Sequence, residues 1–179
     1  NSLAFGKVMQ GDTKEAFIDI DLPTEHMAFL QYTGGTTGVS KGAILTHRNL
    51  MANSAQAYHI FNPKWFDKPT DSQITVICPL PLYHIFALTA HTFALFYHGA
   101  KNVLITNPRD LPTFVGTLKK QKFHVMSGVN TLFEALLNNE DFRKLDFSNF
   151  IGALSGGMAT LPSTAEKWEK VTGTVLLQA

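Results

Sequence analysis

Five short apolar runs, separated by segments of helical periodicity, constrain the fold of this chain more than any other feature. The runs cover residues 74–78, 102–105, 123–127, 150–154 and 174–177. The helical segments between them cover residues 86–97, 111–120, 132–138 and 164–171. A strand recurs about every 25 residues, close to the length of a strand–helix–strand unit, and each run is apolar nearly throughout, as in strands buried on both faces. We therefore predict a doubly wound α/β fold, with a mostly parallel sheet and helices on both faces.

Two segments also carry a residue pattern that is typical of the start of a helix. The segments that begin with Thr131 and Ser163 each carry a glutamate three residues later, at Glu134 and Glu166. This spacing predicts a capping box at the start of two helices.

The first part of the chain departs from this alternation. Residues 27–32 and 43–45 are predicted to form two strands across a glycine- and threonine-rich loop. A helix over residues 50–61 should follow, with Thr46 as its N-cap.

The two ends of the sequence suggest an internal piece of a longer protein. The chain starts at Asn1 and stops directly after the apolar run 174–177. We expect residues 1–25 to be a leading segment cut from a preceding element, and residues 26–179 to be part of one larger domain.

Composition excludes several classes of protein. Of 179 residues, 45% are hydrophobic and 16% are charged, which is enough apolar material for a sizeable core. Lys and Arg number 15 against 14 Asp and Glu, so the basic excess of a nucleic-acid binder is missing. The single cysteine, Cys78, excludes a disulfide framework and fits a reducing compartment such as the cytoplasm. The longest apolar stretch, residues 85–97, is interrupted by His91 and falls short of the ~20 residues that a membrane span needs.

The strongest signal for chemistry lies in residues 32–42. Glycines let backbone N–H groups turn toward an anion, threonine hydroxyls donate to phosphate oxygens or bind Mg²⁺, and Lys41 adds a positive charge. This combination predicts a site for a triphosphate. The spacing excludes a P-loop, because Lys41 follows Ser40 where that motif requires a glycine, and it also excludes the dinucleotide fingerprint.

At this point the sequence resembles a known family. Residues 32–42 are similar to the phosphate-loop signature of the adenylate-forming, or AMP-binding, superfamily, and the double glycine followed by residues 43–50 resembles bacterial long-chain fatty acid–CoA ligases. Residues 79–86 resemble the second core motif of the family. Residues 128–133 and 154–158 resemble its acyl-pocket segment and its adenine turn. The motifs follow in the family order, so the resemblance covers about residues 26–179.

The resemblance implies a two-step reaction. ATP and a fatty acid carboxylate give acyl-AMP and pyrophosphate, and the thiol of coenzyme A then forms the thioester and releases AMP. It implies ATP, Mg²⁺, coenzyme A and a fatty acid as small-molecule partners. It implies a cytoplasmic protein, and peripheral contact with the inner face of a membrane is compatible with a lipid substrate.

The resemblance also implies a role for each motif residue. Lys41 would pair with the leaving pyrophosphate, Thr33 would approach Mg²⁺, and His84 would position the acyl carboxylate and the α-phosphate. The ATP-binding residues would be Thr33, Gly34, Gly35, Thr36, Thr37, Gly38, Lys41 and Gly42 in the phosphate loop (residues 32–43), with Gly156 and Gly157 in the adenine turn (residues 155–158). The acyl pocket would include Ile85, Phe86 and Val129.

Several alternatives stay open. Within the superfamily, a fatty acyl-AMP ligase or an aryl-acid ligase fits the same motifs, and outside it a non-catalytic nucleotide-binding or interaction module does. The family's second Mg²⁺ ligand and its C-terminal domain with a catalytic lysine are not in this sequence, so we expect these 179 residues alone to be inactive. His84, His91 and His98 recur every seven residues, but no carboxylate or cysteine accompanies them, and we predict no metal site there.

Overall fold

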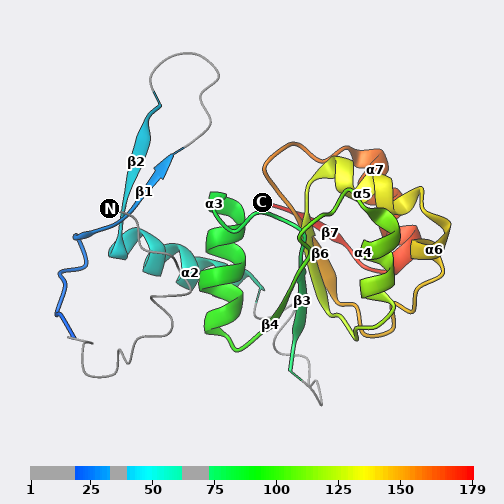
Figure 1. Cartoon of the computed structure of the whole chain (residues 1–179), viewed down its shortest axis with the longest axis horizontal. Coiled ribbons are helices and arrows are strands. Elements are labelled where there is room, and N and C mark those ends of the chain that lie inside the picture. The colour runs from blue at the N-terminus through cyan, green and yellow to red at the C-terminus, as the bar shows by residue number, and fades with distance from the viewer. Residues whose placement is uncertain (1–18, 33–39, 62–72) are drawn as a thin grey trace, which may run out of the picture.

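The computed structural model describes residues 19–32, 40–61 and 73–179. Figure 1 shows two regions: a layered region built on a parallel sheet, and beside it a hairpin with a helix at its base. We call residues 73–179 the sheet half, and residues 19–32 with 40–61 the hairpin half. The predicted phosphate loop joins the two strands of the hairpin half.

The sheet half contains a sheet of five parallel strands in the order β4-β3-β5-β6-β7. Its strands are β3 (Thr75–Cys78), β4 (Lys101–Leu104), β5 (Val125–Gly128), β6 (Gly152–Ser155) and β7 (Leu176–Gln178). Each one overlaps a predicted apolar run, displaced by one or two residues, and every strand neighbour is parallel. The predicted doubly wound, mostly parallel α/β architecture is confirmed.

Helices cover both faces of this sheet. They are α3 (Ile85–Ala87), the π-helix η2 (Leu88–Leu95), α4 (Leu111–Leu118), α5 (Asn130–Leu137), α6 (Glu140–Arg143) and α7 (Pro162–Thr172). Alternate residues of one strand point to opposite faces: Ile77 joins the core beneath α4, α5, α6 and α7, whereas Val76 joins the core beneath η2. Burial on both faces explains why the strands are apolar throughout.

The two predicted capping boxes are wrong. Helix α5 begins at Asn130 and α7 at Pro162, so Thr131 and Ser163 already lie within the first helical turn, and neither helix has a side-chain cap. The polar side chains join the two helices instead. The Asn130 side-chain oxygen accepts from the Leu161 N–H at 3.0 Å, and the Glu134 carboxylate accepts from the Thr164 hydroxyl at 3.1 Å.

The predicted helix over residues 86–97 starts as α3 and continues as the π-helix η2. The hydroxyl of Thr89 donates to the Ile85 carbonyl at 2.8 Å and to the Phe86 carbonyl at 3.3 Å. A side chain that occupies these carbonyls competes with the backbone bonds of an ordinary α-helix. The wider turn also removes the alignment of His84, His91 and His98 that seven-residue spacing gives in an α-helix.

The hairpin half consists of β1 (Met27–Tyr32), β2 (Gly42–Thr46) and α2 (His47–Phe61), with the two strands antiparallel. Among residues 19–32 and 40–60, Leu50 is the one buried side chain. This region therefore has little core of its own, and it lies against the sheet half through η2, which Figure 1 shows standing between α2 and the sheet.

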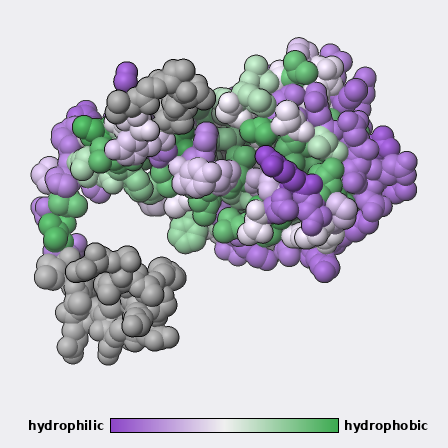
Figure 2. Space-filling view, turned by 45° about the horizontal axis from the view of Figure 1, so that its top comes forward, coloured by the Kyte–Doolittle hydropathy of each residue, from purple (hydrophilic) through white to green (hydrophobic). Residues whose placement is uncertain are grey.

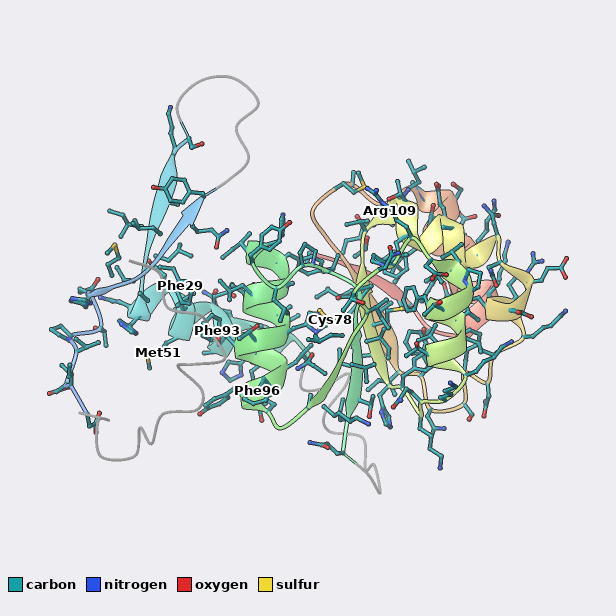
Figure 3. All side chains as sticks on the ribbon, in the orientation of Figure 1. Phe29, Met51, Cys78, Phe93, Phe96 and Arg109 are labelled. Atoms are coloured by element: carbon teal, nitrogen blue, oxygen red, sulfur yellow. The ribbon has the colours of Figure 1, made fainter. Side chains whose placement is uncertain are left out.

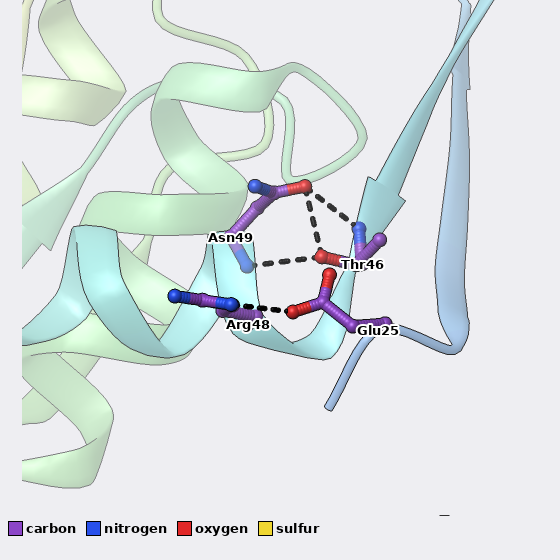
Figure 4. A network of polar contacts seen from close by, with 4 residues as sticks. All are labelled: Glu25, Thr46, Arg48 and Asn49. Carbon is purple, nitrogen blue, oxygen red and sulfur yellow. Dashed lines mark hydrogen bonds and ion pairs between the residues drawn. The ribbon is translucent and has the colours of Figure 1, made fainter. Parts of the chain in front are cut away.

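The start of α2 confirms the predicted N-cap. The Asn49 N–H donates to the Thr46 hydroxyl at 3.2 Å, and the Asn49 side-chain oxygen accepts from the Thr46 N–H at 3.0 Å (Figure 4). This is a reciprocal cap with asparagine at the third helical position. The Arg48 guanidinium pairs with Glu25 at 2.7 Å, which ties the segment before β1 to the same helix start.

Candidate active site

The base of the predicted phosphate loop is formed by the ends of β1 and β2. Tyr32 lies opposite Gly42 across the hairpin, and a Cβ placed on Gly42 would lie 3.0 Å from the Tyr32 ring. Glycine is therefore needed here for the close approach of the aromatic ring. The side chain of Lys41, next in sequence, is exposed to solvent, so its ammonium group can reach an anion.

Most of the predicted phosphate loop lies outside the described residues. This applies to Thr33, Gly34, Gly35, Thr36, Thr37 and Gly38. The predicted Mg²⁺ ligand, Thr33, is among them.

His84 lies in the loop between β3 and η2 and caps the start of α3. Its Nδ1 accepts from the Phe86 N–H at 3.2 Å, and its ring is exposed. Because Nδ1 acts as an acceptor, the proton of the neutral ring is on Nε2. The cap thus leaves an N–H donor that faces away from the helix, as a residue that positions an oxygen ligand requires.

The predicted adenine turn contacts the predicted acyl-pocket residues. Gly156 follows β6 directly, and a Cβ there would lie 3.0 Å from the Phe86 ring. Gly157 has a φ of 77°, in the left-handed region, and a Cβ on it would lie 3.8 Å from Val129. Gly156 also donates its N–H to the Gly128 carbonyl at 3.1 Å. These contacts lie at the carboxyl ends of β5 and β6, the edge at which α/β sheets bind ligands.

An apolar groove of about 220 Å³ opens beside this turn, between α2, the α3–η2 segment and the sheet. Its lining residues are Asn53, Gln56, Ala57, Ile60, Phe86, Thr89, Ala90, Leu154 and Ala179. Of the three predicted acyl-pocket residues, Phe86 lines this groove, whereas Ile85 and Val129 are not in its lining. The α2 residues that line the groove were not identified from the sequence, because small and polar residues on a helix give no sequence signal for ligand binding.

Two contacts join the hairpin to the sheet half, one on the loop that carries His84 and one on η2. The Gln31 side-chain amide donates to the Tyr83 carbonyl at 3.1 Å. The rings of Phe29 and Phe93 meet edge to face with centroids 5.9 Å apart. Both side chains are labelled in Figure 3. No sequence signal could have identified Gln31, because its partner is a backbone carbonyl 52 residues away.

Other titratable groups near the sheet are structural. Cys78 is buried at the end of β3 and its thiol contacts the Leu80 carbonyl at 3.5 Å. Burial raises the pKa of the Cys78 thiol, which favours its protonated form. In the described ranges, no three His, Cys, Asp or Glu side chains converge as a metal site. The helices in the same ranges include none with the length and apolar character of a membrane span.

Comparison with known proteins gives consistent matches. The family model of the AMP-binding enzymes matches residues 5–179. The chain is 45% identical over 178 residues to a long-chain-fatty-acid–CoA ligase of Salmonella typhimurium, an alignment that covers 99% of this chain and 31% of that protein. The chain thus spans about a third of the length of the curated relatives that it matches.

Solved structures share the fold. An N-terminal domain of FACL13 from Mycobacterium tuberculosis superposes with a TM-score of 0.76 at 18% identity, over 97% of this chain and 41% of that one. A structure of MatB from Rhodopseudomonas palustris with ATP bound has a TM-score of 0.71 at 31% identity, over 92% of this chain and 31% of that one.

Proposed function

Because this chain belongs to the AMP-binding enzyme family, we propose that it supplies the nucleotide-binding and acyl-binding portion of a long-chain fatty acid–CoA ligase. The whole reaction would form acyl-AMP from ATP and a fatty acid and then transfer the acyl group to coenzyme A. The Salmonella typhimurium relative is named a long-chain-fatty-acid–CoA ligase, and it aligns with this chain over nearly the whole of these 179 residues.

One observation carries the proposal: Phe86 lines the groove and also packs against the predicted adenine turn. Its ring lines the apolar groove and packs on Gly156. A fatty acid in the groove would therefore have its carboxyl end near the edge where a nucleotide would lie. Adenylation requires this arrangement, because a carboxylate oxygen attacks the α-phosphorus while the bond to pyrophosphate breaks.

The chain's own side chains would assist that step by orientation and charge. The Nε2–H of His84 would hold a carboxylate or phosphate oxygen, and the exposed Lys41 would meet the negative charge that develops on pyrophosphate. The Mg²⁺ assignment stays a prediction, because Thr33 lies outside the described residues. Peripheral membrane contact, a cytoplasmic location and the choice of coenzyme A as acceptor also stay predictions.

A chimera tests the proposal directly. In the Salmonella typhimurium ligase, this chain would replace the third of the protein that it matches. We expect palmitate-dependent exchange of pyrophosphate into ATP, and formation of palmitoyl-CoA when coenzyme A is added. Exchange without the thioester would support the fatty acyl-AMP ligase alternative, and activation of aromatic acids alone would support the aryl-acid ligase.

Matched lysine variants of the chimera sharpen this test. Lys41→Ala should lower the exchange rate by about 10²–10³-fold, the usual cost of removing one group that stabilises a transition-state charge. Lys122→Ala should leave the rate unchanged. This exposed lysine lies before β5, at the amino ends of the strands and away from the candidate site. A folded chimera that shows no acid-dependent exchange, or a Lys41→Ala variant as fast as its parent, would contradict the proposal.

A further inference from the structure

A buried chain of polar side chains connects η2 to two strands of the sheet. The Nδ1 of His91 contacts the Asn102 side-chain oxygen at 2.7 Å, and its Nε2 contacts the Ser127 hydroxyl. His91 and Ser127 are 1% and 2% exposed. These three hydrogen-bonded side chains belong to none of the sequence motifs and have no part in the proposed chemistry.

The positions of the protons follow from the partners. The Asn102 side-chain nitrogen donates to the His91 carbonyl at 3.3 Å, so its oxygen is the atom that faces the ring. His91 therefore donates from Nδ1 and accepts the Ser127 hydroxyl at Nε2. Burial lowers the pKa of His91, which keeps the ring neutral, and all of its polar atoms are satisfied.

Packing alone does not require a polar residue at this position. The other buried residues of η2, Ala94 and Leu95, are apolar, and Leu95 packs against Val76 of the sheet. Apolar contacts tolerate sliding and rotation, because they have no preferred direction. The two hydrogen bonds of His91 end on different strands, β4 and β5, and so fix both the rotation and the height of η2 on the sheet.

The same segment forms one wall of the apolar groove. Thr89 and Ala90, two and one residues before His91, line it together with Ala57 of α2 and Leu154 of β6. A shift of η2 would move these two residues and change the width of the groove. The segment is π-helical, a geometry that is rare in proteins and occurs frequently at functional sites.

We infer that His91 is a positioning residue that sets the width of the apolar groove and thereby the range of acyl chains that it accepts. Asn102 and Ser127 act through it as the fixed points on the sheet. The inference rests on the proposed function, since it assigns the groove to the acyl chain.

The test compares His91→Leu with His124→Gln in the chimera described above. His124 is the matched control: it is also a buried histidine, with Nδ1 accepting from the Thr75 N–H at 3.0 Å, but this bond lies within the sheet half, on β3, and not on η2. Steady-state constants are measured for fatty acids of increasing length and for ATP. We expect His91→Leu to raise KM for the best acid about tenfold and to shift the preferred length, with KM for ATP unchanged.

Two further variants and one further measurement separate an effect on the groove from a general loss of stability. Ser127→Ala, which removes one bond, should shift the length preference in the same direction by less, whereas His124→Gln should lower thermal stability and leave the length preference unchanged. Amide hydrogen exchange adds a readout independent of activity: η2 should exchange faster in His91→Leu than in the parent chain. A folded His91→Leu variant with the parental length profile and exchange would overturn the inference, whereas a parent chimera without acid-dependent activity would overturn the proposed function instead.

Discussion

The two halves of this molecule differ in how they are held together. The sheet half buries large side chains on both faces of its sheet, with Trp168, Phe114, Phe133 and Phe142 completely enclosed. The hairpin half exposes large apolar side chains, including Phe29, Leu30, Ile44 and Met51, and buries Leu50 among residues 19–32 and 40–60. In Figure 2 the right side, over the helices of the sheet half, is mostly hydrophilic, whereas hydrophobic and hydrophilic residues are mixed over the middle and the hairpin.

The difference separates a scaffold from a part that depends on it. Strand–helix–strand units in the sheet half bury their own apolar faces, so they are stable through local contacts. The two strands that flank the predicted phosphate loop contact the sheet half through the Gln31 bond to Tyr83 and the Phe29–Phe93 ring pair, and helix α2 packs against η2, with Tyr58 stacked on His98. The candidate site lies where these two kinds of structure meet.

The largest expected effect is the loss of the aromatic core of the sheet half. Trp168 packs against Phe133 and Phe142 at ring-centroid distances of 4.8 and 5.6 Å. Trp168→Ala should lower the free energy of unfolding by about 3–5 kcal/mol. The matched change in the hairpin half, Phe29→Ala, should cost about 1 kcal/mol because that ring is 37% exposed. Urea denaturation followed by far-UV circular dichroism measures both, and equal losses would contradict the contrast between the two halves.

The sheet half was largely predictable because its pattern is local. An apolar run of four or five residues between amphipathic helices has few other ways to be buried, so all five strands were found. The helix starts were not, since Asn130 and Glu134 satisfy groups on the neighbouring helix and not on their own. At the start of the π-helix the Thr89 hydroxyl donates to the Ile85 and Phe86 carbonyls, a pairing that residue spacing cannot indicate.

The candidate site was predictable only where a motif names its residues. The motifs named Phe86, Gly156, Gly157 and Val129, and in the structure Gly156 approaches the Phe86 ring and Gly157 approaches Val129. The roles proposed for them stay predictions. The wall from α2 and the Asn102–His91–Ser127 chain arise from tertiary packing between segments far apart in sequence, so no local pattern encodes them.

A second prediction tests the point where groove and turn meet. Gly156→Ala should force its new Cβ against the Phe86 ring, now 3.0 Å away, and cost about 1–3 kcal/mol of unfolding free energy. Adding Phe86→Leu should recover part of that loss. Gly116→Ala in α4 is the control: nothing lies within 4 Å of the new Cβ, so it should stabilise the chain by about 0.5–1 kcal/mol. A Gly156→Ala variant as stable as its parent would show that the ring moves freely, and the close contact would then place no constraint on the turn.

A third prediction concerns pH and the buried histidines of the sheet half. Burial lowers the pKa of both His91 and His124, so between these lowered values and the unfolded value of about 6.5 the unfolded chain binds more protons. The stability that these neutral histidines contribute is therefore fully present above about pH 6.5, and the free energy of unfolding falls as the pH drops below this value. Urea unfolding midpoints at about pH 7.5 and 5.5 measure this loss of stability. The double variant His91→Asn with His124→Gln should lose less stability between the two pH values. Asp110 and Asp146, whose pKa values are lowered by hydrogen bonds from Thr113 and Ser148, contribute only in more acidic solution. An undiminished loss in the double variant would assign it to other groups.

The smallest effects belong to the start of α2 in the hairpin half. Thr46→Ala removes a cap that satisfies the Asn49 N–H and should cost about 1 kcal/mol of unfolding free energy. Arg48→Ala removes the ion pair with Glu25, and because both side chains are mostly exposed, at 72% and 64%, we expect no measurable change. Helix α2 also forms a wall of the groove, so a frayed start should be seen first as faster amide exchange in its opening turn. If Arg48→Ala proved as costly as Thr46→Ala, the segment before β1 would be holding the hairpin in place, and the hairpin half would depend less on the sheet half than the contacts of Gln31 and Phe29 indicate.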